Sequence, residues 1–592
     1  MSARELITEH LGLWTGAVTQ KSTRGRGSNG KVELTGIKKL RELILELAIR
    51  GKLVEQASVS ETASELLARI GLEITTRAKE QKKIKKQKKM LQVDKNDEPF
   101  PLPENWSWTR LGDVCELENG DRGKNYPNKS SLVESGVPFV NAGHLHGHEV
   151  IQDEMTFITE ERFNLLRSGK FQEGDILFCL RGSLGKAGIV RGMQRGAIAS
   201  SLIIVRPILD ITEYVMLYLK APLSSVMVGM YDNGTAQPNL SGKDFKSFLV
   251  PLPPLKEQHR IVQKVDELMA LCDRLEQQTS DQLEAHETLV DTLLGTLTQS
   301  QDATELVDNW ARLATHFDTL FTTEQSIEKL KQTILQLAVM GRLVEQDDSD
   351  EPASEFIKML EIKKQELSRE SKQRKTKPLP PIEESEEPFR LPPGWFLSRL
   401  DDITDIQGGI AKGKKLSGKK MRSLPYLRVA NVQRASLDLS IIKDIEIAEN
   451  EIERYLVHPR DLLITEGGDW DKVGRTAIWD GSINPMAHQN HVFRARLILD
   501  EQNERWIERY LNSQFARDYF ASSSKQTTNL ASINKTQLRS CTIPLPPLEE
   551  QARIVQKVDE LMALCDQLKE RLSQASEIRN QLAEVVVKKS LL

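Results

Sequence analysis

The sequence contains few cysteines, and none of them lies close to another. Cys115, Cys179, Cys272, Cys541 and Cys565 are scattered along 592 residues, and there is no CxxC pair. A disulfide framework needs many cysteines in a small domain, and a structural zinc site needs closely spaced ligands. The cysteine pattern therefore argues against both and suits a chain in the reducing cytoplasm.

Long apolar runs are missing as well. No stretch of 18 consecutive apolar residues occurs, and Met1 is not followed by a basic segment and an apolar core. A membrane-spanning helix needs about 20 apolar residues, so neither a span nor a secretion signal is expected. Neither charge dominates, because 81 basic residues face 85 acidic ones and the net charge is −4. Nucleic-acid binding would therefore depend on local basic surfaces.

Signatures of catalysis are also absent. The sequence has no G-x-S-x-G, no H-E-x-x-H, and no helicase or nuclease signature. An adenine methyltransferase would carry a Gly-rich cofactor loop and an Asn-Pro-Pro-aromatic or Asp-Pro-Pro-Tyr tetrapeptide. Asn484-Pro485-Met486 comes nearest to that tetrapeptide and lacks the stacking aromatic residue. What remains is the composition of a binding protein.

Two weak motifs have simpler interpretations. Gly25 to Lys31 approaches a phosphate-binding P-loop, but Val32 stands where Ser or Thr would hold magnesium, and no strand precedes it. A flexible linker is the better interpretation. His144, His146 and His148 alternate as in a strand or loop, which favours a polar surface over a metal site.

The sequence does contain a long internal repeat. Pro251 to Asp273 recurs 293 residues later at Pro544 to Asp566, and only two of the 23 positions differ. Upstream, Ile37 to Gln56 recurs at Ile327 to Gln346. Chance does not produce such matches, so the chain is a tandem duplication.

Apolar residues in the repeated segment follow a heptad pattern. Three prolines open each copy and favour extended backbone, and the 4-3-4-3 spacing that follows predicts a long amphipathic helix. Two core helices would show the same pattern, but the near-identity of the copies favours two helices that pack on each other around a pseudo-twofold axis. The residues expected to form the helix seam and to dock partner subunits are Ile261, Val265, Leu268, Cys272 and Leu275, and Ile554, Val558, Leu561, Cys565 and Leu568.

A basic tract follows the first repeated helix in each half, at Arg77 to Lys89 and at Lys363 to Lys377. A solvated helix face or a linker is the favoured interpretation, and contact with DNA phosphates is the alternative. Each half then enters a predicted domain at a tryptophan, Trp106 or Trp395.

Both predicted domains have the same frame of short strands and one helix. The strands are expected at Val137 to Val140, Asp175 to Leu180 and Leu202 to Val205, and at Pro425 to Val429, Asp461 to Thr465 and Val492 to Ala495. The helices are expected around Glu213 to Leu219 and Glu504 to Leu511. The loops between these elements carry different polar residues in the two copies, as expected of two readers of different targets.

Polar loop residues are the candidates for contact with bases, since Arg and Lys suit guanine while Asn and Gln suit adenine. In the first domain they are Asn141, His144, Arg181, Ser183, Lys186, Asn233, Gln237, Asn239 and Lys243. In the second domain they are Arg428, Asn431, Gln433, Arg434, Lys472, Arg475, Gln489, Asn490, Asn529 and Lys535.

This layout resembles the specificity subunit of type I restriction-modification systems, and most of all the larger members of family B. The resemblance covers nearly the whole chain, and its most specific marks are the repeated segments Val250 to Glu276 and Ile543 to Lys569. Residues 1–35 have no counterpart in the second half.

The resemblance implies an α+β fold, in which long antiparallel coiled-coil helices separate two globular mixed α/β target-recognition domains. The implied segments are an N-terminal extension (1–35), a helical conserved region (36–97), target-recognition domain 1 (98–255), a central long helix (256–300), a second helical region with a basic linker (301–386), target-recognition domain 2 (387–548) and a C-terminal long helix (549–592).

The resemblance also implies a function and partners. Each domain would read one half of an asymmetric bipartite site in double-stranded DNA, and the helices would set the spacer and dock two modification subunits. Two restriction subunits would complete the complex. This chain would bind no cofactor or metal, while S-adenosylmethionine, ATP and magnesium would act on the partners. A self-contained DNA methyltransferase and a coiled-coil protein tether are the alternatives.

Overall fold

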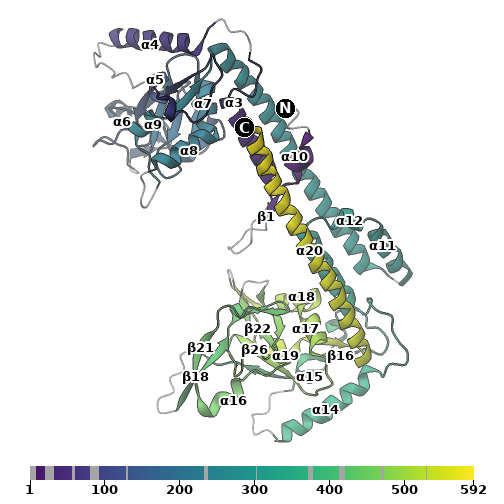
Figure 1. Ribbon diagram of the computed structural model, residues 1–592. Coiled ribbons are helices and arrows are strands. Elements are labelled where there is room, and N and C mark those ends of the chain that lie inside the picture. The colour runs from purple at the N-terminus through teal and green to yellow at the C-terminus, as the bar shows by residue number, and fades with distance from the viewer. Residues whose placement is uncertain are drawn as a thin grey trace. The chain divides into compact units, whose positions relative to one another are not determined.

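The chain folds into two compact units, each of which contains one mixed α/β domain and part of both long helices (Figure 1). In the computed structural model, the described residues are 9–20, 32–56, 61–80, 93–128, 131–232, 238–301, 303–370, 378–411, 420–468, 472–527 and 530–591. The first unit comprises Met1–Gln282 and Ala575–Leu592, and the second comprises Leu283–Gln574.

The domain of the first unit has two sheets. The larger one has the order β4 (Cys115–Asn119), β14 (Leu202–Pro207), β11 (Ile176–Cys179), β12 (Ala187–Ile189), β8 (Glu149–Val150) and β7 (Leu145–His146). The other has the order β10 (Lys170–Gln172), β13 (Arg195–Ile198), β6 (Val137–Val140), β9 (Phe157–Ile158) and β5 (Leu132–Val133). The helices are α5 (Leu111–Val114), α6 (Glu160–Leu165), α7 (Thr212–Lys220), α8 (Pro222–Tyr231) and α9 (Gly242–Lys246). All four residues of β11 are buried, as expected of an apolar run at the centre of a covered sheet.

The domain of the second unit repeats this frame. Its main sheet has the order β17 (Thr404–Gly408), β26 (Val492–Leu497), β22 (Leu462–Thr465) and β24 (Thr476–Ile478). Two further sheets are β21 (Lys443–Ala448), β18 (Met421–Leu427) and β25 (Ala487–His488), and β23 (Gly467–Gly468), β28 (Leu530–Ser532) and β27 (Lys525–Thr527). A small hairpin pairs β19 (Val432–Gln433) with β20 (Ser436–Leu437). The helices are α15 (Leu400–Ile403), α16 (Ile452–Tyr455), α17 (Glu504–Asn512), α18 (Gln514–Ser523) and α19 (Lys535–Ser540).

A two-stranded ladder closes each domain where the chain enters and leaves it. In the first domain β3 (Ser107–Arg110) pairs with β15 (Leu249–Leu252), and in the second β16 (Phe396–Arg399) pairs with β29 (Thr542–Leu545). Trp106 and Trp395 are buried just before these ladders, as predicted. Each indole packs against a glycine with φ of +69°, Gly51 or Gly341, where a Cβ atom would lie less than 3 Å from a proline side chain. Only glycine fits this position, which explains its recurrence in both repeats.

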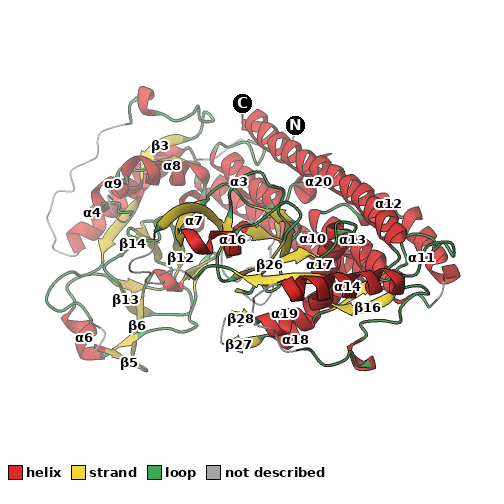
Figure 2. Cartoon of the chain, turned by 90° about the horizontal axis from the view of Figure 1, so that it is seen from below, coloured by secondary structure: helices red, strands yellow, loops and turns green. Residues whose placement is uncertain are grey.

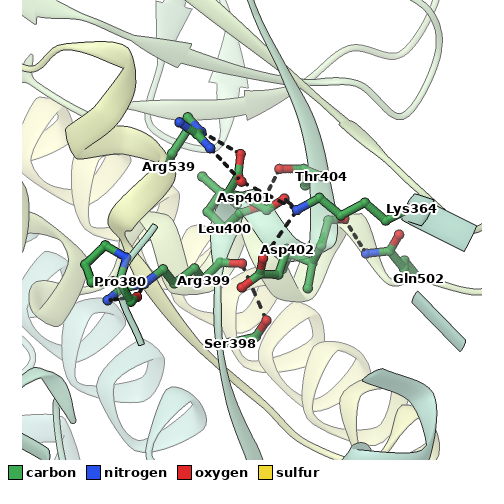
Figure 3. A network of polar contacts seen from close by, with 11 residues as sticks. Lys364, Pro380, Ser398, Arg399, Leu400, Asp401, Asp402, Thr404, Gln502 and Arg539 are labelled. Carbon is green, nitrogen blue, oxygen red and sulfur yellow. Dashed lines mark hydrogen bonds and ion pairs between the residues drawn. The ribbon is translucent and has the colours of Figure 1, made fainter. Parts of the chain in front are cut away.

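A polar network fixes the second domain to the helix α14 (Ala353–Glu370) (Figure 3). The guanidinium of Arg539 donates two hydrogen bonds to Asp401, at 2.7 and 3.0 Å, and the ammonium of Lys364 on α14 also contacts Asp401. The buried Arg399 pairs with Glu386 at 2.9 Å. In the first domain Gly112 stands at the position of Asp401, and the side chain of Lys246 lies where Arg539 does, so the network belongs to the second domain.

The scaffold of the first unit is helical. It consists of α2 (Leu11–Gly16), α3 (Thr35–Ile49), α4 (Ala63–Glu80), the beginning of α10 (Leu255–Gln299) and the end of α20 (Leu548–Leu591). The apolar face of α3 shares one buried cluster with Ile261 and Val265 of α10 and with Ala583 of α20. At the edge of that cluster, Arg41 pairs with Asp273 at 2.6 Å and Lys39 pairs with Glu584 at 2.7 Å.

The second unit repeats this scaffold with the two long helices exchanged. It contains the end of α10, the beginning of α20, α11 (Ala303–Thr315), α12 (Phe317–Leu320), α13 (Glu324–Val339) and α14. Lys331 of α13 pairs with Asp566 at 2.6 Å, and Lys329 pairs with Asp291 at 2.7 Å. These pairs stand at the repeat positions of Arg41 with Asp273 and of Lys39 with Glu584. Because each unit joins the beginning of one long helix to the end of the other, the two helices run antiparallel, as predicted.

Residues 9–20 have a structural counterpart that the sequence does not show. In the first unit, the carbonyl of Val18 lies 3.2 Å from the Ser576 hydroxyl in the C-terminal half of α20. In the second unit, the carbonyl of Thr319 lies 3.1 Å from the ring of His286 in the C-terminal half of α10. Residues 9–20 and the α11–α12 segment therefore support equivalent helix ends without a similar sequence.

The predicted strands and helices are confirmed, with differences of at most four residues at their ends, and Figure 2 shows the strands of the domains together with the helices. The predicted Gly-rich linker 25–31 and most of both basic tracts lie outside the described residues. Within the part of the chain that the structure describes, no helix is long and apolar enough to cross a membrane.

Candidate nucleic-acid interface

A buried aspartate anchors the central strand of each domain. Asp175, just before β11, receives two hydrogen bonds from Arg206 at 2.8 and 2.7 Å. Asp461, just before β22, receives two from Arg496 at 2.7 Å each. Both aspartates are 1% exposed. The pairs hold one end of β11 and β22 in the core, and the polar loops that follow these strands lie at the other end.

In the first domain, the loop after β11 displays three of the predicted residues. Gly182 and Gly185 adopt φ of +77° and +82°, which permits the tight turn from β11 into β12. Arg181, Ser183 and Lys186 are exposed on this turn. The turn therefore presents a cation, a hydroxyl and a second cation to solvent within six residues.

The same turn is tied to the segment before α9. Arg181 and Asn239 form an isolated β-bridge, and the Nε of Arg181 donates a hydrogen bond of 2.8 Å to the Asn239 side chain. Lys243, also exposed, lies four residues further on. The structure thus brings together three predicted residues that come from two distant segments.

A cavity of about 360 Å³ lies beside this bridge. Its wall is formed by Asn119, Gly120, Arg122, Arg181, Asn239, Leu240, Ser241, Gly242 and Lys243. Three of these side chains are cationic and none is a carboxylate. Partial burial and the neighbouring charge of Arg181 lower the pKa of the Arg122 guanidinium. Arg122 escaped the sequence reasoning, because its segment contains no motif and only the fold brings it next to Arg181.

Asn141 and His144 have a different place. They cap the short turn after β6, where the Asn141 side chain accepts from the Gly143 amide at 2.7 Å and the His144 Nδ1 accepts from the Asn141 amide at 3.0 Å. His144 is only 5% exposed. Its ring shapes the turn and is not displayed on the surface, unlike the residues at the end of β11.

In the second domain, the equivalent turn after β18 is held by Arg428 and Asn431. The amide nitrogen of Asn431 donates to the carbonyls of Asp438 and Ile441, and the Arg428 guanidinium also donates to Ile441, at 2.7 Å. Asn431 is 2% exposed. These two residues, like Asn141 and His144, organise a loop.

The end of β22 in the second domain gathers a different polar set. Arg475 donates a hydrogen bond of 2.7 Å to the Gln433 side chain, and Arg434 follows on the same hairpin. The ring of His491 lies 2.9 Å from the carboxylate of Glu466, and Asn490 lies beside that ring. This surface mixes donors with acceptors, whereas the cavity of the first domain is cationic.

The remaining predicted residues of the second domain are more scattered. Lys472 is half-buried after β23, and the backbone amides of Gln489 and Asn490 pair with the neighbouring strand segments. Burial lowers the pKa of Lys535 at the start of α19. Asn233, Gln237 and Asn529 lie outside the described residues.

The predicted seam of the long helices is buried inside the units. Ile261, Val265, Leu268, Cys272, Ile554, Val558 and Cys565 are at most 6% exposed, and Leu275, Leu561 and Leu568 are partly buried. Large apolar residues of the long helices that are at least half exposed are Leu289, Leu564, Ile578, Leu582 and Val585. Leu289 and Leu582 occupy the same repeat position.

The described residues offer donors and cations for binding. Among them, no group of three His, Cys, Asp or Glu side chains is placed to hold a metal ion. Arg, Asn and Gln side chains at the strand ends are the types that contact base edges and phosphates in protein–DNA interfaces. The geometry therefore suits recognition of a nucleic acid.

Comparison with known proteins identifies the family. The model of the type I restriction modification DNA specificity domain matches residues 103–285 and 392–577. The chain is 38% identical over 609 residues to the type I restriction enzyme EcoEI specificity subunit of Escherichia coli, with 100% of both chains covered. It is 38% identical over 595 residues to the EcoAI specificity subunit of Escherichia coli, with 99% of both chains covered.

Among solved structures, the crystal structure of the HsdS subunit from Thermoanaerobacter tengcongensis is 19% identical, with a TM-score of 0.41, and covers 84% of this chain and 99% of its own. The family model matches both repeats. The two relatives from Escherichia coli are named specificity subunits, and the match to them spans nearly the whole of each chain. The chain therefore belongs to the family of type I restriction-modification specificity subunits.

Proposed function

We propose that this chain directs a type I restriction-modification complex to an asymmetric, bipartite site in double-stranded DNA. Each domain reads one half of the site. The observation that carries the proposal is the same strand frame, built twice, with different polar side chains at the ends of β11 and β22. A cationic set with Arg181 and Asn239 stands in the first domain, and the Arg475–Gln433 pair stands in the second.

The chemistry of these side chains supports base recognition in the second domain. An arginine can donate two hydrogen bonds to guanine, and a glutamine can exchange two with adenine. The hydrogen bond between Arg475 and Gln433 holds both side chains in a fixed relation before DNA arrives. A preorganised pair loses less side-chain entropy on binding, which favours both affinity and selectivity.

The scaffold supports a role in assembly. Two copies of one modification subunit need two equivalent docking surfaces, and α10 and α20 supply them. Leu289 and Leu582 are each 50% exposed at the same repeat position, so they are candidates for the docking contacts. The buried seam residues instead fix the helices within each unit.

The catalytic partners complete the proposal. S-adenosylmethionine bound to the modification subunits would methylate adenine at N6, and restriction subunits would use ATP and magnesium for cleavage. A base must leave the helical stack before it is methylated, and the partner would provide the pocket for it. This chain would bind none of these cofactors and would act in the cytoplasm.

Selection from random-sequence duplexes by the chain assembled with its modification subunits tests the proposal. We expect two short fixed elements separated by an unread spacer, with the half-sites about one helical turn apart. Selection of one contiguous element, or of none, would overturn the proposal. Binding of S-adenosylmethionine by the isolated chain would favour a self-contained methyltransferase instead.

The substitution Arg475→Ala tests the proposal at a single residue. Its control is Arg517→Ala, which lies on α18 and outside the polar set at the end of β22. If Arg475 contacts a base, its loss should cost about 1–3 kcal/mol of binding free energy and relax selectivity at one position of one half-site. The control should leave the selected sequence unchanged.

A further inference from the structure

The cavity of the first domain differs from the rest of the polar surface in its charge. Arg122, Arg181 and Lys243 line it together, and none of the described residues of its wall is a carboxylate. Burial and the charge of Arg181 both lower the pKa of Arg122, so the two guanidinium groups repel each other across the cavity. An anion placed between them would remove that repulsion.

The contacts of these side chains leave donors for a ligand. Arg181 uses its Nε for the hydrogen bond to Asn239, which orients the guanidinium and leaves its two terminal amino groups. The structure records no hydrogen bond or ion pair between the side chain of Arg122 or Lys243 and another described residue. The carboxylate of the adjacent Asp121 is already engaged by the backbone amides of Gly123 and Arg167, at 2.6 and 2.8 Å.

The shape of the site distinguishes a phosphate from a base. Base edges lie at the floor of a DNA groove, so a side chain that reads them must project from the protein. A recessed site instead receives a group that projects from the DNA, which is a phosphate or a base turned out of the stack. A turned-out base is held between aromatic or apolar side chains, and Leu240 is the only such residue among the described residues of this wall.

We propose that the cavity lined by Arg122, Arg181 and Lys243 holds a phosphate group of the DNA backbone. The proposal rests on the proposed function, since it names one contact of the same DNA complex. It assigns Arg181 to positioning of the duplex, while the bases of that half-site are read by other residues.

At the described positions that correspond to Arg122, Arg181 and Lys243, the second domain carries no cation. Counted from the start of β4 and β17, Ala411 stands where the first domain has Arg122. Counted from the buried aspartate before the central strand, Gly467 corresponds to Arg181 of the first domain. Counted from the residue that caps the short helix α9 or α19, Thr536 corresponds to Lys243.

The test compares the assembled complex with a variant that carries Arg122→Gln, Arg181→Gln and Lys243→Gln. Lys124→Gln is the matched control, because Lys124 is exposed two residues from Arg122 and does not line the cavity. Dissociation constants are measured between 50 and 200 mM salt, on the selected site and on duplexes with one altered base pair in the first half-site. Loss of one phosphate contact should reduce the salt slope by about 0.9, so the affinity ratio of wild type to variant should shrink about 3-fold over this range.

The variant should keep its preference among the duplexes, and the control should match the wild type. A second variant, Arg122→Lys with Arg181→Lys, keeps both charges and should retain the wild-type salt slope. An unchanged slope and affinity in the triple variant would overturn the proposal. So would a loss that depends on the altered base pair, because it would assign these residues to base reading.

Two competition measurements distinguish a phosphate of the DNA backbone from a free phosphate compound. Inorganic phosphate and ATP are added at constant ionic strength, and neither should compete with DNA more in the wild type than in the triple variant. Selective competition would assign the cavity to a free phosphate compound and overturn the DNA contact. If the wild-type complex prefers no duplex at all, the proposed function itself fails, which this design distinguishes from failure of the cavity alone.

Discussion

Replacement of the buried Asp461 by Asn should weaken the second domain while it leaves the first intact. Asp461 accepts two hydrogen bonds from Arg496 and one from the His458 amide, all at 2.7 Å. Asparagine keeps the size of the side chain but replaces one acceptor oxygen by an amino group, which must face a donor. Loss of one partner in a buried ion pair costs about 3–5 kcal/mol. The Arg496 side chain is 32% exposed, so water compensates part of this loss and the lower limit, about 3 kcal/mol, applies.

Hydrogen exchange with mass spectrometry measures this change domain by domain. A loss of about 3 kcal/mol should increase the local opening equilibrium roughly 100-fold for amides of β22 and β26. Amides of β11 and β14 in the first domain should keep their wild-type exchange rates. The matched variant is Asp175→Asn, which removes the equivalent pair with Arg206 and should show the opposite pattern.

Two results would refute this reasoning. The first is a loss below about 1 kcal/mol, which would mean that the pair contributes no more than a surface contact. The second is equal loss of protection in both domains after one substitution, which would mean that they do not unfold as separate units. If the expectation holds, each variant should also lose recognition of one half-site before the other.

Three further predictions concern other parts of the chain. Burial lowers the pKa of His488 to about 4. Because the unfolded chain binds a proton at higher pH than the folded chain, the free energy of unfolding should fall by roughly 3 kcal/mol as the pH is lowered from 6.5 to 4. Denaturation midpoints at several pH values check this; His488→Asn should flatten the pH dependence, whereas the substitution His146→Asn at an exposed position should not. Gly341→Ala places an alanine at φ of +69° with its Cβ 2.8 Å from a proline carbon. It should lower the free energy of unfolding by about 2–3 kcal/mol, as measured by thermal denaturation. The control Gly71→Ala, within α4 and with open space around the glycine, should raise the stability slightly. Insertion of one or two helical turns after Glu276 should lengthen the unread spacer without a change of the bases read, and a changed base preference with the old spacing would contradict this.

Much of the frame could be predicted from the sequence, because it rests on local patterns. The apolar run after Asp175 and the one after Asp461 each became a buried central strand. The heptad positions became helices of 45 and 44 residues. What the seam residues pack against was less predictable. The beginning of each long helix lies in a buried apolar cluster with α3 or α13 as well as with the end of the other long helix. Periodicity shows that a face is buried and does not show what covers it.

The candidate site was harder to predict, because the same residue types serve two purposes. Asn and His can contact bases, and they can equally satisfy backbone groups in a turn. His144 and Asn431 do the latter in this structure and are buried. Arg122 shows the opposite case, since its place beside Arg181 depends on contacts between segments about 60 residues apart. No local pattern records such a neighbour.

The central claim is that each domain reads one half of the DNA site independently of the other. Its most direct test is exchange of residues 98–255 for the corresponding domain of a relative with another specificity, followed by mapping of methylated adenines in cells that carry the modification subunit. We expect the first half of the methylated site to change, while the second half and the spacer length stay as they are in the parent. A change in both halves would contradict the claim.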